Sequence, residues 1–271
     1  MNILERIVAD KRREVAELRT RLGEAELRRR AEGQPRRDFV AALRAAPGGM
    51  GLIAEVKRRS PSRGEIRPDL DPAGIARAYA AAGAQVISVL MDRRYFGGGE
   101  EDFREVRAVV DLPLLYKEFV IDPVQVWHAA ALGASAVLLI AALYPEEILR
   151  RLVAECGEAG VSALVEVHSE EELGRALRAG AQCIGINNRD LRTFEVSVDT
   201  TRRLARLLAR HTGRPPGSVL KISESGIADP GIVAELRELG IEAVLVGEHL
   251  LRQADPGEGI RRLMARVWGS S

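Results

Sequence analysis

The sequence predicts an α/β fold, a single-domain (β/α)8 TIM barrel with an N-terminal helical extension. Two observations predict it. A helix–glycine–strand unit recurs along the chain, and eight apolar segments of strand length are each followed by a helical stretch. The length of 271 residues also suits one barrel of this kind, since such barrels typically have roughly 250 residues.

The repeated unit is recognised by a glycine that separates two patterns. It reads AAGAQVISVL, ALGASAVLLI, EAGVSALVEV, RAGAQCIGIN and ELGIEAVLVG. Amphipathic helical residues precede each glycine, and glycine just past a helix is the usual left-handed cap. The runs after it are apolar on both faces and rich in valine and isoleucine, which is typical of parallel strands covered on both sides. Helices therefore alternate with parallel strands along the chain.

The segments of strand length number eight. They lie near residues 51–57, 85–91, 112–117, 135–140, 161–167, 182–187, 218–223 and 242–247. Eight parallel βα units in one domain predict a closed barrel. An open doubly wound sheet is the competing fold, but its G-x-G-x-x-G signature does not follow an early strand here.

Residues 1–48 precede the first of these units. Ile3, Ile7, Val15 and Leu18 recur at helical spacing, so we expect one or two helices packed on the barrel. Residues 49–271 then form the barrel itself, which carries the catalytic site. No linker of biased composition indicates a second domain.

Composition excludes several classes of partner. The net charge of +1 provides no general attraction to nucleic acid or to an acidic membrane surface. No apolar stretch is long enough to span a membrane, and no signal-peptide core is present, so a cytoplasmic location is expected. Cys156 and Cys183 lack disulfide or metal-ligand spacing and suit the core. We expect no metal site.

Lysine is scarce in this chain. Only four of the 40 basic residues are lysines, namely Lys11, Lys57, Lys117 and Lys221. A buried lysine can shift its pKa and transfer a proton, whereas arginine stays charged. Lys57 and Lys117 end apolar strands and are the first candidates for chemistry. The alternative is a lysine with a buried stem and a solvated tip. Lys221 is expected to be structural, and Lys11 to lie on the surface of an N-terminal helix.

Polar side chains gather where the apolar strands end, which is where active sites lie in this fold. Glu55 and Lys57 end the first strand and share one face, because side chains alternate along a strand. The other strand-end residues are Lys117, Glu166, Asn187, Glu224 and Ser225. Burying such charges is costly, so a functional site is favoured over a layer of salt bridges that closes the barrel.

Three loops suggest an anion site. SPSRG follows the first strand and contains Ser60, SESGI follows the seventh with Gly226, and VGE follows the eighth with Gly247. Loops after strands 7 and 8 often bind phosphate in this fold, and glycine lets backbone N–H groups approach the oxygens. Plain turns are the alternative.

The runs IAEVKRRSPSRG, SVLMDRRYFGGG, LLYKEFVIDPVQV, ALVEVHSEEEL, IGINNRDLRTFEV, ISESGI and VLVGEHLLR resemble the indole-3-glycerol phosphate synthase family of tryptophan biosynthesis. The resemblance spans essentially the whole chain. It implies a carboxy-lyase that converts 1-(2-carboxyphenylamino)-1-deoxyribulose 5-phosphate to indole-3-glycerol phosphate, without cofactor or metal. The implied partner is this phosphorylated small molecule, and we expect a monomer or weak homo-oligomer.

The resemblance also implies roles for individual residues. Lys117 matches the general acid at the substrate ketone, Lys57 a substrate-contacting lysine, and Glu166 a catalytic acid or base. Glu55 matches a carboxylate that supports the lysines. The remaining matches are substrate contacts at Asn187, Arg189, Glu224, Ser225 and Phe119, and phosphate contacts at Ser60, Gly226 and Gly247. Partial burial and neighbouring cations are expected to lower the pKa values of the lysines, and burial to raise that of Glu166.

Three positions depart from the family pattern. Glu118 stands where aspartate is common, Met91 where threonine often follows the second strand, and Glu248 where a small residue often helps to bind phosphate. Two rival functions remain open. A Schiff-base aldolase also needs a buried strand-end lysine, and a non-catalytic barrel would bind a phosphorylated metabolite without turnover.

Overall fold

A computed structural model describes residues 3–190, 193–210 and 217–269. Its centre is a closed parallel barrel with the strand order β1-β10-β9-β8-β7-β6-β5-β4. The barrel strands are β1 (Gly51–Val56), β4 (Val86–Leu90), β5 (Leu114–Lys117), β6 (Ala136–Ile140), β7 (Ser162–Val167), β8 (Cys183–Asn187), β9 (Leu220–Glu224) and β10 (Ala243–Val246). β2 (Arg59–Ser60) and β3 (Gly64–Glu65) form a small antiparallel hairpin after β1.

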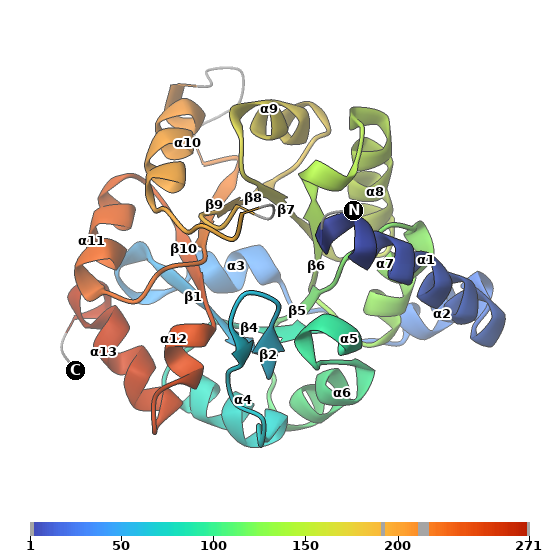
Figure 1. The fold of residues 1–271 in the computed structure, drawn as a ribbon, viewed down its shortest axis with the longest axis horizontal. Helices are drawn as coiled ribbons and strands as arrows, with labels where there is room; N and C mark the ends of the chain where they lie inside the picture. Colours follow the sequence, from blue (N-terminus) through green and yellow to red (C-terminus); the bar gives the residue numbers. More distant parts are fainter. Residues whose placement is uncertain (1–2, 191–192, 211–216, 270–271) are drawn as a thin grey trace.

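Closure of the barrel comes from β1, which pairs with both the second and the last barrel strand. Ile53 is in register with Val86 of β4 and with Leu245 of β10. The eight predicted strands are confirmed, and the open doubly wound sheet is wrong. In Figure 1 the strands lie at the centre, and most helices form a ring around them.

The helices alternate with the strands after an N-terminal group. Before β1 come α1 (Ile3–Arg21), α2 (Glu24–Glu32), α3 (Phe39–Arg44) and the short 3-10 turn η1 (Pro47–Gly49). After β1 come α4 (Pro72–Ala81), α5 (Arg93–Phe96), α6 (Glu100–Val109), α7 (Pro123–Ala131), η2 (Ala141–Leu143), α8 (Glu146–Glu158), α9 (Glu170–Arg178), α10 (Asp199–Arg210), α11 (Pro230–Glu238), α12 (Glu248–Leu251) and α13 (Pro256–Trp268).

An Asp-Pro pair starts several of these helices. The aspartate accepts a hydrogen bond from a backbone N–H of the first turn, and proline occupies a position whose N–H has no helical partner. The pairs begin α4, α7, α11 and α13 at Asp71, Asp122, Asp229 and Asp255. These local signals fix where the helices leave the loops that surround the barrel.

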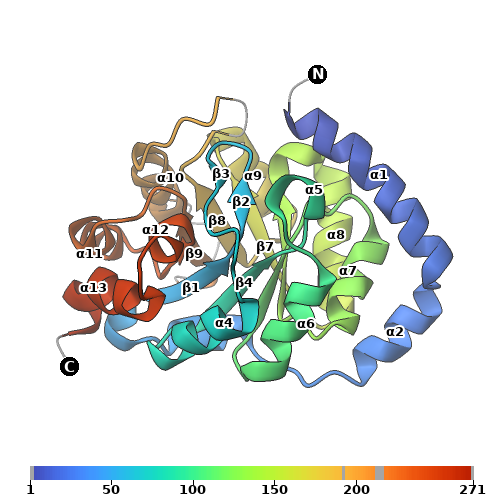
Figure 2. The same cartoon turned by 60° about the horizontal axis from the view of Figure 1, so that its bottom comes forward.

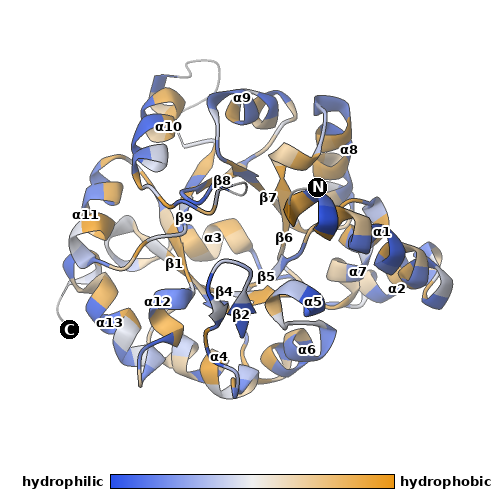
Figure 3. Ribbon diagram, viewed as in Figure 1, coloured by the Kyte–Doolittle hydropathy of each residue, from blue (hydrophilic) through white to orange (hydrophobic). Residues whose placement is uncertain are grey.

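Apolar side chains pack on both sides of the strands. Inside the barrel, Ile53, Leu115, Leu164 and Ile222 belong to one buried cluster. Phe39 of α3 belongs to the same cluster. A larger cluster fills the space between the strands and the outer helices. Figure 3 accordingly shows strands coloured mostly as hydrophobic and helices that alternate between hydrophobic and hydrophilic residues. Both cysteines are free and buried, as predicted for core residues.

The N-terminal helix α1 runs along the outside of the barrel beside α7, and α2 turns beneath it (Figure 2). The expectation that Lys11 lies on the surface of this helix is wrong. Its side chain is 1% exposed and pairs with Asp92 and Glu118 at the ends of β4 and β5. Sequence spacing within α1 gives no sign of these carboxylates. Among the described residues, no helix is long and apolar enough to cross a membrane.

Candidate active site

A cavity of about 430 Å³ opens at the carboxyl ends of the barrel strands. It brings together side chains from β1, β5, β7, β8 and the loops after β9 and β10. The predicted site residues that line it are Glu55, Lys57, Ser60, Lys117, Phe119, Glu166, Asn187, Arg189, Ser225, Gly226 and Gly247. Glu224 lies just behind this lining and contacts Lys117. The polar side chains thus surround a cavity and do not close the barrel.

Glu55 and Lys57 form a close pair on one side of the cavity. Lys57 Nζ donates to Glu55 Oε1 at 2.5 Å, and the Glu55 side chain is almost fully buried. Burial opposes the ionised form of Glu55, but the charges of Lys57 and Lys117 outweigh it and lower the pKa of this carboxyl. Gly247 makes room for the pair, because a Cβ there would lie 2.6 Å from Glu55 Oε1.

Lys117 lies among three carboxylates. Its Nζ donates to Glu224 Oε2 at 2.6 Å and lies 3.8 Å from Glu166 Oε2. Burial favours the neutral amine, but Glu224, Glu166 and Glu55 together outweigh it and raise the pKa of Lys117. The expectation of a lowered pKa is therefore wrong for Lys117. This lysine is an ammonium group at neutral pH, held in place by its carboxylate partners.

Glu166 has the opposite balance. Burial and the nearby Glu224 carboxylate raise the pKa of Glu166 to about 7, against the opposing effects of Lys117 and of a hydrogen bond from Asn187. This direction agrees with the sequence-based expectation. At neutral pH both protonation states of Glu166 are populated, which suits a group that gives or takes a proton.

The position of the Glu224 carboxylate depends on a glycine of the neighbouring strand. Gly185 lies on β8, and a Cβ there would be 2.1 Å from Glu224 Oε1 and 3.1 Å from its Cδ. Glu224 is 1% exposed, so its carboxylate has little space into which it can move. Among the buried side-chain atoms of the described residues, Glu224 Oε1 accepts no hydrogen bond. The missing side chain at position 185 lets Glu224 reach Lys117.

The variant Gly185→Ala tests this arrangement. The added methyl group is expected to displace the Glu224 carboxylate and, with it, Lys117. Turnover should fall about 100-fold, the cost typical of a small misplacement of a catalytic group. Circular dichroism and steady-state kinetics measure folding and activity in the same preparation. The matched variant Gly157→Ala adds a methyl group on α8 where no atom lies within 4 Å, and it should keep normal kinetics.

The part of the cavity rim formed by the loops after β1, β8 and β10 is rich in arginine. Arg189 Nη1 donates to Ser62 Oγ at 3.2 Å, in the loop that also carries Ser60. Arg63 and Arg252 line the same rim, and both form ion pairs with Glu248. Burial lowers the pKa of Arg189, which nevertheless stays charged. Arg63 and Arg252 are not among the predicted site residues, because neither belongs to a strand end.

The loop after β9 has an unusual backbone. Ser225 has a φ of 69° and Gly226 one of 73°, in the left-handed region that residues other than glycine rarely adopt. The Asn188 amide holds this turn by donating to the Ser225 carbonyl oxygen at 3.0 Å. A Cβ at Gly226 would lie 2.4 Å from Val196 Cγ1. Both the backbone conformation and the packing therefore favour glycine at position 226.

Two phenylalanines form an aromatic wall of the cavity. Phe96, at the end of α5, and Phe119, after β5, line it with their ring centroids 6.0 Å apart. Family resemblance predicts Phe119 as a site residue, whereas Phe96 is not among the predicted site residues. Its position directly before three glycines after a strand is the signal that was available. The pair provides an apolar surface beside the charged groups.

Comparison with known proteins identifies the family. Residues 4–263 match the family described as indole-3-glycerol phosphate synthase. The indole-3-glycerol phosphate synthase of Roseiflexus sp. (strain RS-1) is 48% identical, covering 96% of this chain and 97% of that relative. That of Chromobacterium violaceum is 46% identical and covers 97% of each chain.

A solved structure shows a similar fold at low sequence identity. Thiamine phosphate pyrophosphorylase from Pyrococcus furiosus superposes with a TM-score of 0.59 at 15% identity, over 81% of this chain and 96% of that one. This likeness concerns the barrel alone. The near-complete coverage by much closer relatives decides the assignment: the chain belongs to the indole-3-glycerol phosphate synthase family, carboxy-lyases of tryptophan biosynthesis.

Proposed function

We propose that this chain converts 1-(2-carboxyphenylamino)-1-deoxyribulose 5-phosphate to indole-3-glycerol phosphate by general acid–base catalysis. One observation carries the proposal: an ammonium group, Lys117, is held between Glu224 and Glu166 at the cavity formed by the strand ends. A ring closure onto a ketone needs a proton donor at the ketone oxygen, and Lys117 is the proposed donor. Family membership supports the same substrate.

Ring closure forms one bond and breaks another. The ring carbon that bears the carboxylate attacks the ketone carbon, and the ketone oxygen accepts the proton of Lys117. The carboxylate then leaves as carbon dioxide, and its bonding electrons restore the aromatic ring. The raised pKa of Lys117 keeps it protonated until this step. The developing alkoxide is a much stronger base than an amine, so the transfer remains favourable.

Dehydration completes the indole. The hydroxyl group formed in the first stage leaves as water after it is protonated, and a base removes a proton from the neighbouring carbon. Glu166 is the proposed base, because its pKa of about 7 balances both protonation states. Lys57 is the proposed acid, and Glu55 holds it at 2.5 Å. The two stages release one carbon dioxide and one water, which balances the reaction.

The cavity walls suit the two ends of this substrate. Arg189, Ser60 and the backbone at Gly226 and Gly247 provide positive charge and hydrogen-bond donors for the phosphate. Phe119 and Phe96 provide an apolar face for the substrate's aromatic ring. Asn187 and Ser225 complete the proposed contacts with the substrate, and Glu224 acts through Lys117.

Turnover tests this proposal. The purified chain is incubated with the substrate, and indole formation is followed by fluorescence. A steady rise that is absent from an identically purified Lys117→Met variant is expected. The variant controls for contaminating host enzyme. No fluorescence from the wild-type chain would leave a non-catalytic barrel that only binds a phosphorylated metabolite.

A Schiff-base mechanism is the remaining enzymatic alternative. The carboxylates around Lys117 argue against it, because an ammonium group has no free electron pair with which to attack a carbonyl. Borohydride added during turnover separates the two mechanisms. The intact mass of the chain should stay unchanged, whereas a reduced adduct on Lys117 would establish the aldolase-like reaction.

Glu248 gives a further prediction at the arginine-rich rim. Its carboxylate pairs with Arg252 at 3.1 Å and with Arg63 at 3.5 Å, and it would repel a phosphate. In Glu248→Gln both arginines become available to the anion, so KM should fall about threefold with little change in kcat, as expected for one exposed charge pair. Kinetics at low and high salt check this, since the gain should shrink as salt screens it. An increase in KM would contradict it.

We also propose a cytoplasmic location, a monomer or weak homo-oligomer, and a division into the helical extension 1–48 and the catalytic barrel 49–271. The free buried cysteines are compatible with a reducing compartment. Sedimentation of the purified chain measures its oligomeric state. A stable dimer at low micromolar concentration would contradict the second of these proposals.

A further inference from the structure

A buried ion cluster joins the N-terminal helix to two strand ends of the barrel. Lys11 Nζ lies 2.8 Å from Asp92 Oδ2, 3.0 Å from Glu118 Oε2 and 2.7 Å from Glu14 Oε2. Asp92 follows β4, and Glu118 directly follows Lys117 at the end of β5. Lys11 and Asp92 are each 1% exposed. The proposed chemistry uses none of these groups.

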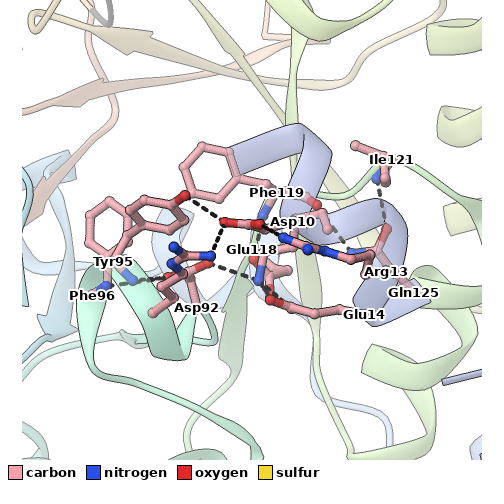
Figure 4. A network of polar contacts seen from close by, with 12 residues as sticks. Asp10, Arg13, Glu14, Asp92, Tyr95, Phe96, Glu118, Phe119, Ile121 and Gln125 are labelled. Carbon is pink, nitrogen blue, oxygen red and sulfur yellow. Dashed lines mark hydrogen bonds and ion pairs between the residues drawn. The ribbon is translucent and has the colours of Figure 1, made fainter. Parts of the chain in front are cut away.

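The other oxygen of each carboxylate accepts a hydrogen bond from the backbone N–H of a phenylalanine in the cavity wall. Asp92 Oδ1 accepts from the backbone N–H groups of Tyr95 and Phe96, at 2.6 and 3.3 Å. Glu118 Oε1 accepts from the backbone N–H of Phe119 at 2.7 Å. Figure 4 shows Asp92 beside Tyr95 and Phe96, and Glu118 beside Phe119. Lys11 therefore connects the two carboxylates that fix the backbone of the aromatic wall.

We propose that Lys11 is a positioning residue for the aromatic wall: through Asp92 and Glu118 it holds Phe96 and Phe119 where the aromatic ring of the substrate binds. This inference rests on the proposed function. The N-terminal helix thus becomes part of the site without touching the substrate. The helix contributes the ammonium group of Lys11, which pairs with the carboxylates of Asp92 and Glu118 at the ends of two neighbouring strands.

The energetics favour a defined geometry here. Burial raises the pKa of Glu118 to about 7, and Lys11 acts against this effect. Burial opposes the charge of Lys11 as well, but Glu118 and Asp92 outweigh it and raise the pKa of Lys11. The charges of Lys11 and Glu118 therefore support each other. Removing the lysine leaves two buried carboxylates facing each other, which one of them relieves by taking a proton or by moving.

Other contacts hold α1 on the barrel independently of Lys11. Arg19 donates to both carboxylate oxygens of Asp122, at 2.8 and 3.0 Å, on the surface of α7. Asp10 accepts from the Tyr95 hydroxyl at 2.6 Å. Loss of Lys11 should therefore loosen the aromatic wall while α1 stays docked. Arg19→Met is a matched control that removes a cationic tether of the same helix.

The test compares kinetics in a double-mutant cycle. Lys11→Met should lower kcat/KM about tenfold or more, mainly through KM, whereas Arg19→Met should stay within about twofold of wild type. Phe119→Leu should also lower kcat/KM. If Lys11 acts through the wall, the double variant Lys11→Met/Phe119→Leu should lose clearly less than the product of the two single losses, because part of the effect of Lys11 passes through Phe119. Lys11→Arg, which can bridge both carboxylates, should recover most of the affinity.

Three results would overturn the inference. Additive losses of kcat/KM in the double variant would show that Lys11 stabilises the fold without positioning the wall. Equal kinetics of Lys11→Met and Arg19→Met would show the same. If Lys11→Met does not fold, Lys11→Met/Glu118→Gln removes one of the two carboxylates that would otherwise face each other, and the same cycle is run on it with the same criterion. A wild-type chain without turnover would defeat the proposed function and this inference together, whereas an active wild type with an additive cycle defeats this inference alone.

Discussion

Lys117→Arg is expected to bind the substrate nearly as well as the wild-type chain and to lose most of its turnover. Arginine keeps the positive charge beside Glu224 and Glu166, so the electrostatic environment of the cavity changes little. It cannot give up a proton at neutral pH. Losing a positioned general acid typically costs about 10²–10⁴-fold in rate, and we expect the loss in kcat to fall in that range.

Steady-state kinetics and a direct binding measurement separate the two effects for this variant. Lys221→Arg is the matched control, because Lys221 lies near the start of β9 and does not line the cavity. It should behave as wild type. A near-normal kcat for Lys117→Arg would show that charge alone suffices and that Lys117 transfers no proton.

Glu166→Gln should make the chain less active and, above neutral pH, more stable. The amide can neither give nor take a proton, so kcat should fall by about 10²–10⁴-fold. The pKa of Glu166 is raised in the folded state to about 7 from an ordinary value of 4.5. Its protonated form therefore stabilises the fold below pH 4.5, and this stabilisation is lost as the pH rises through about 7.

Glutamine resembles the protonated glutamic acid at every pH, so the two chains should differ only where Glu166 is ionised. The free energy of unfolding of Glu166→Gln should equal that of wild type near pH 4 and exceed it at pH 8. At pH 8 the free energy of unfolding of the variant should exceed that of wild type by about 3 kcal/mol. Urea titrations at both pH values measure it. Lower stability of the variant at pH 8 would mean that the ionised carboxylate is needed for the fold.

Much of the fold follows from local sequence signals. Glycines after helices, the apolar runs that follow them and the Asp-Pro helix starts mark where each element begins or ends. The positions of the site residues follow from the rule that the carboxyl ends of the strands meet at the same end of the barrel. The pattern therefore predicts the positions of Lys57, Lys117 and Glu166, and family resemblance supplies their roles.

The electrostatics could not be read from the sequence in the same way. The pKa of Lys117 depends on Glu224, which is 107 residues away and reaches the lysine only because β8 carries Gly185. Lys11 was missed for the same reason, since Glu118 also lies 107 residues from it. Helical spacing placed Lys11 on α1 correctly but could not show which barrel loops cover it.

The most direct test of the account is the stoichiometry of the reaction. Indole fluorescence and released carbon dioxide are measured together while the purified wild-type chain consumes the substrate. The account predicts one carbon dioxide for each indole formed, with both signals lost in Lys117→Met. Indole without carbon dioxide, or carbon dioxide without indole, would contradict the decarboxylating ring closure assigned to this site.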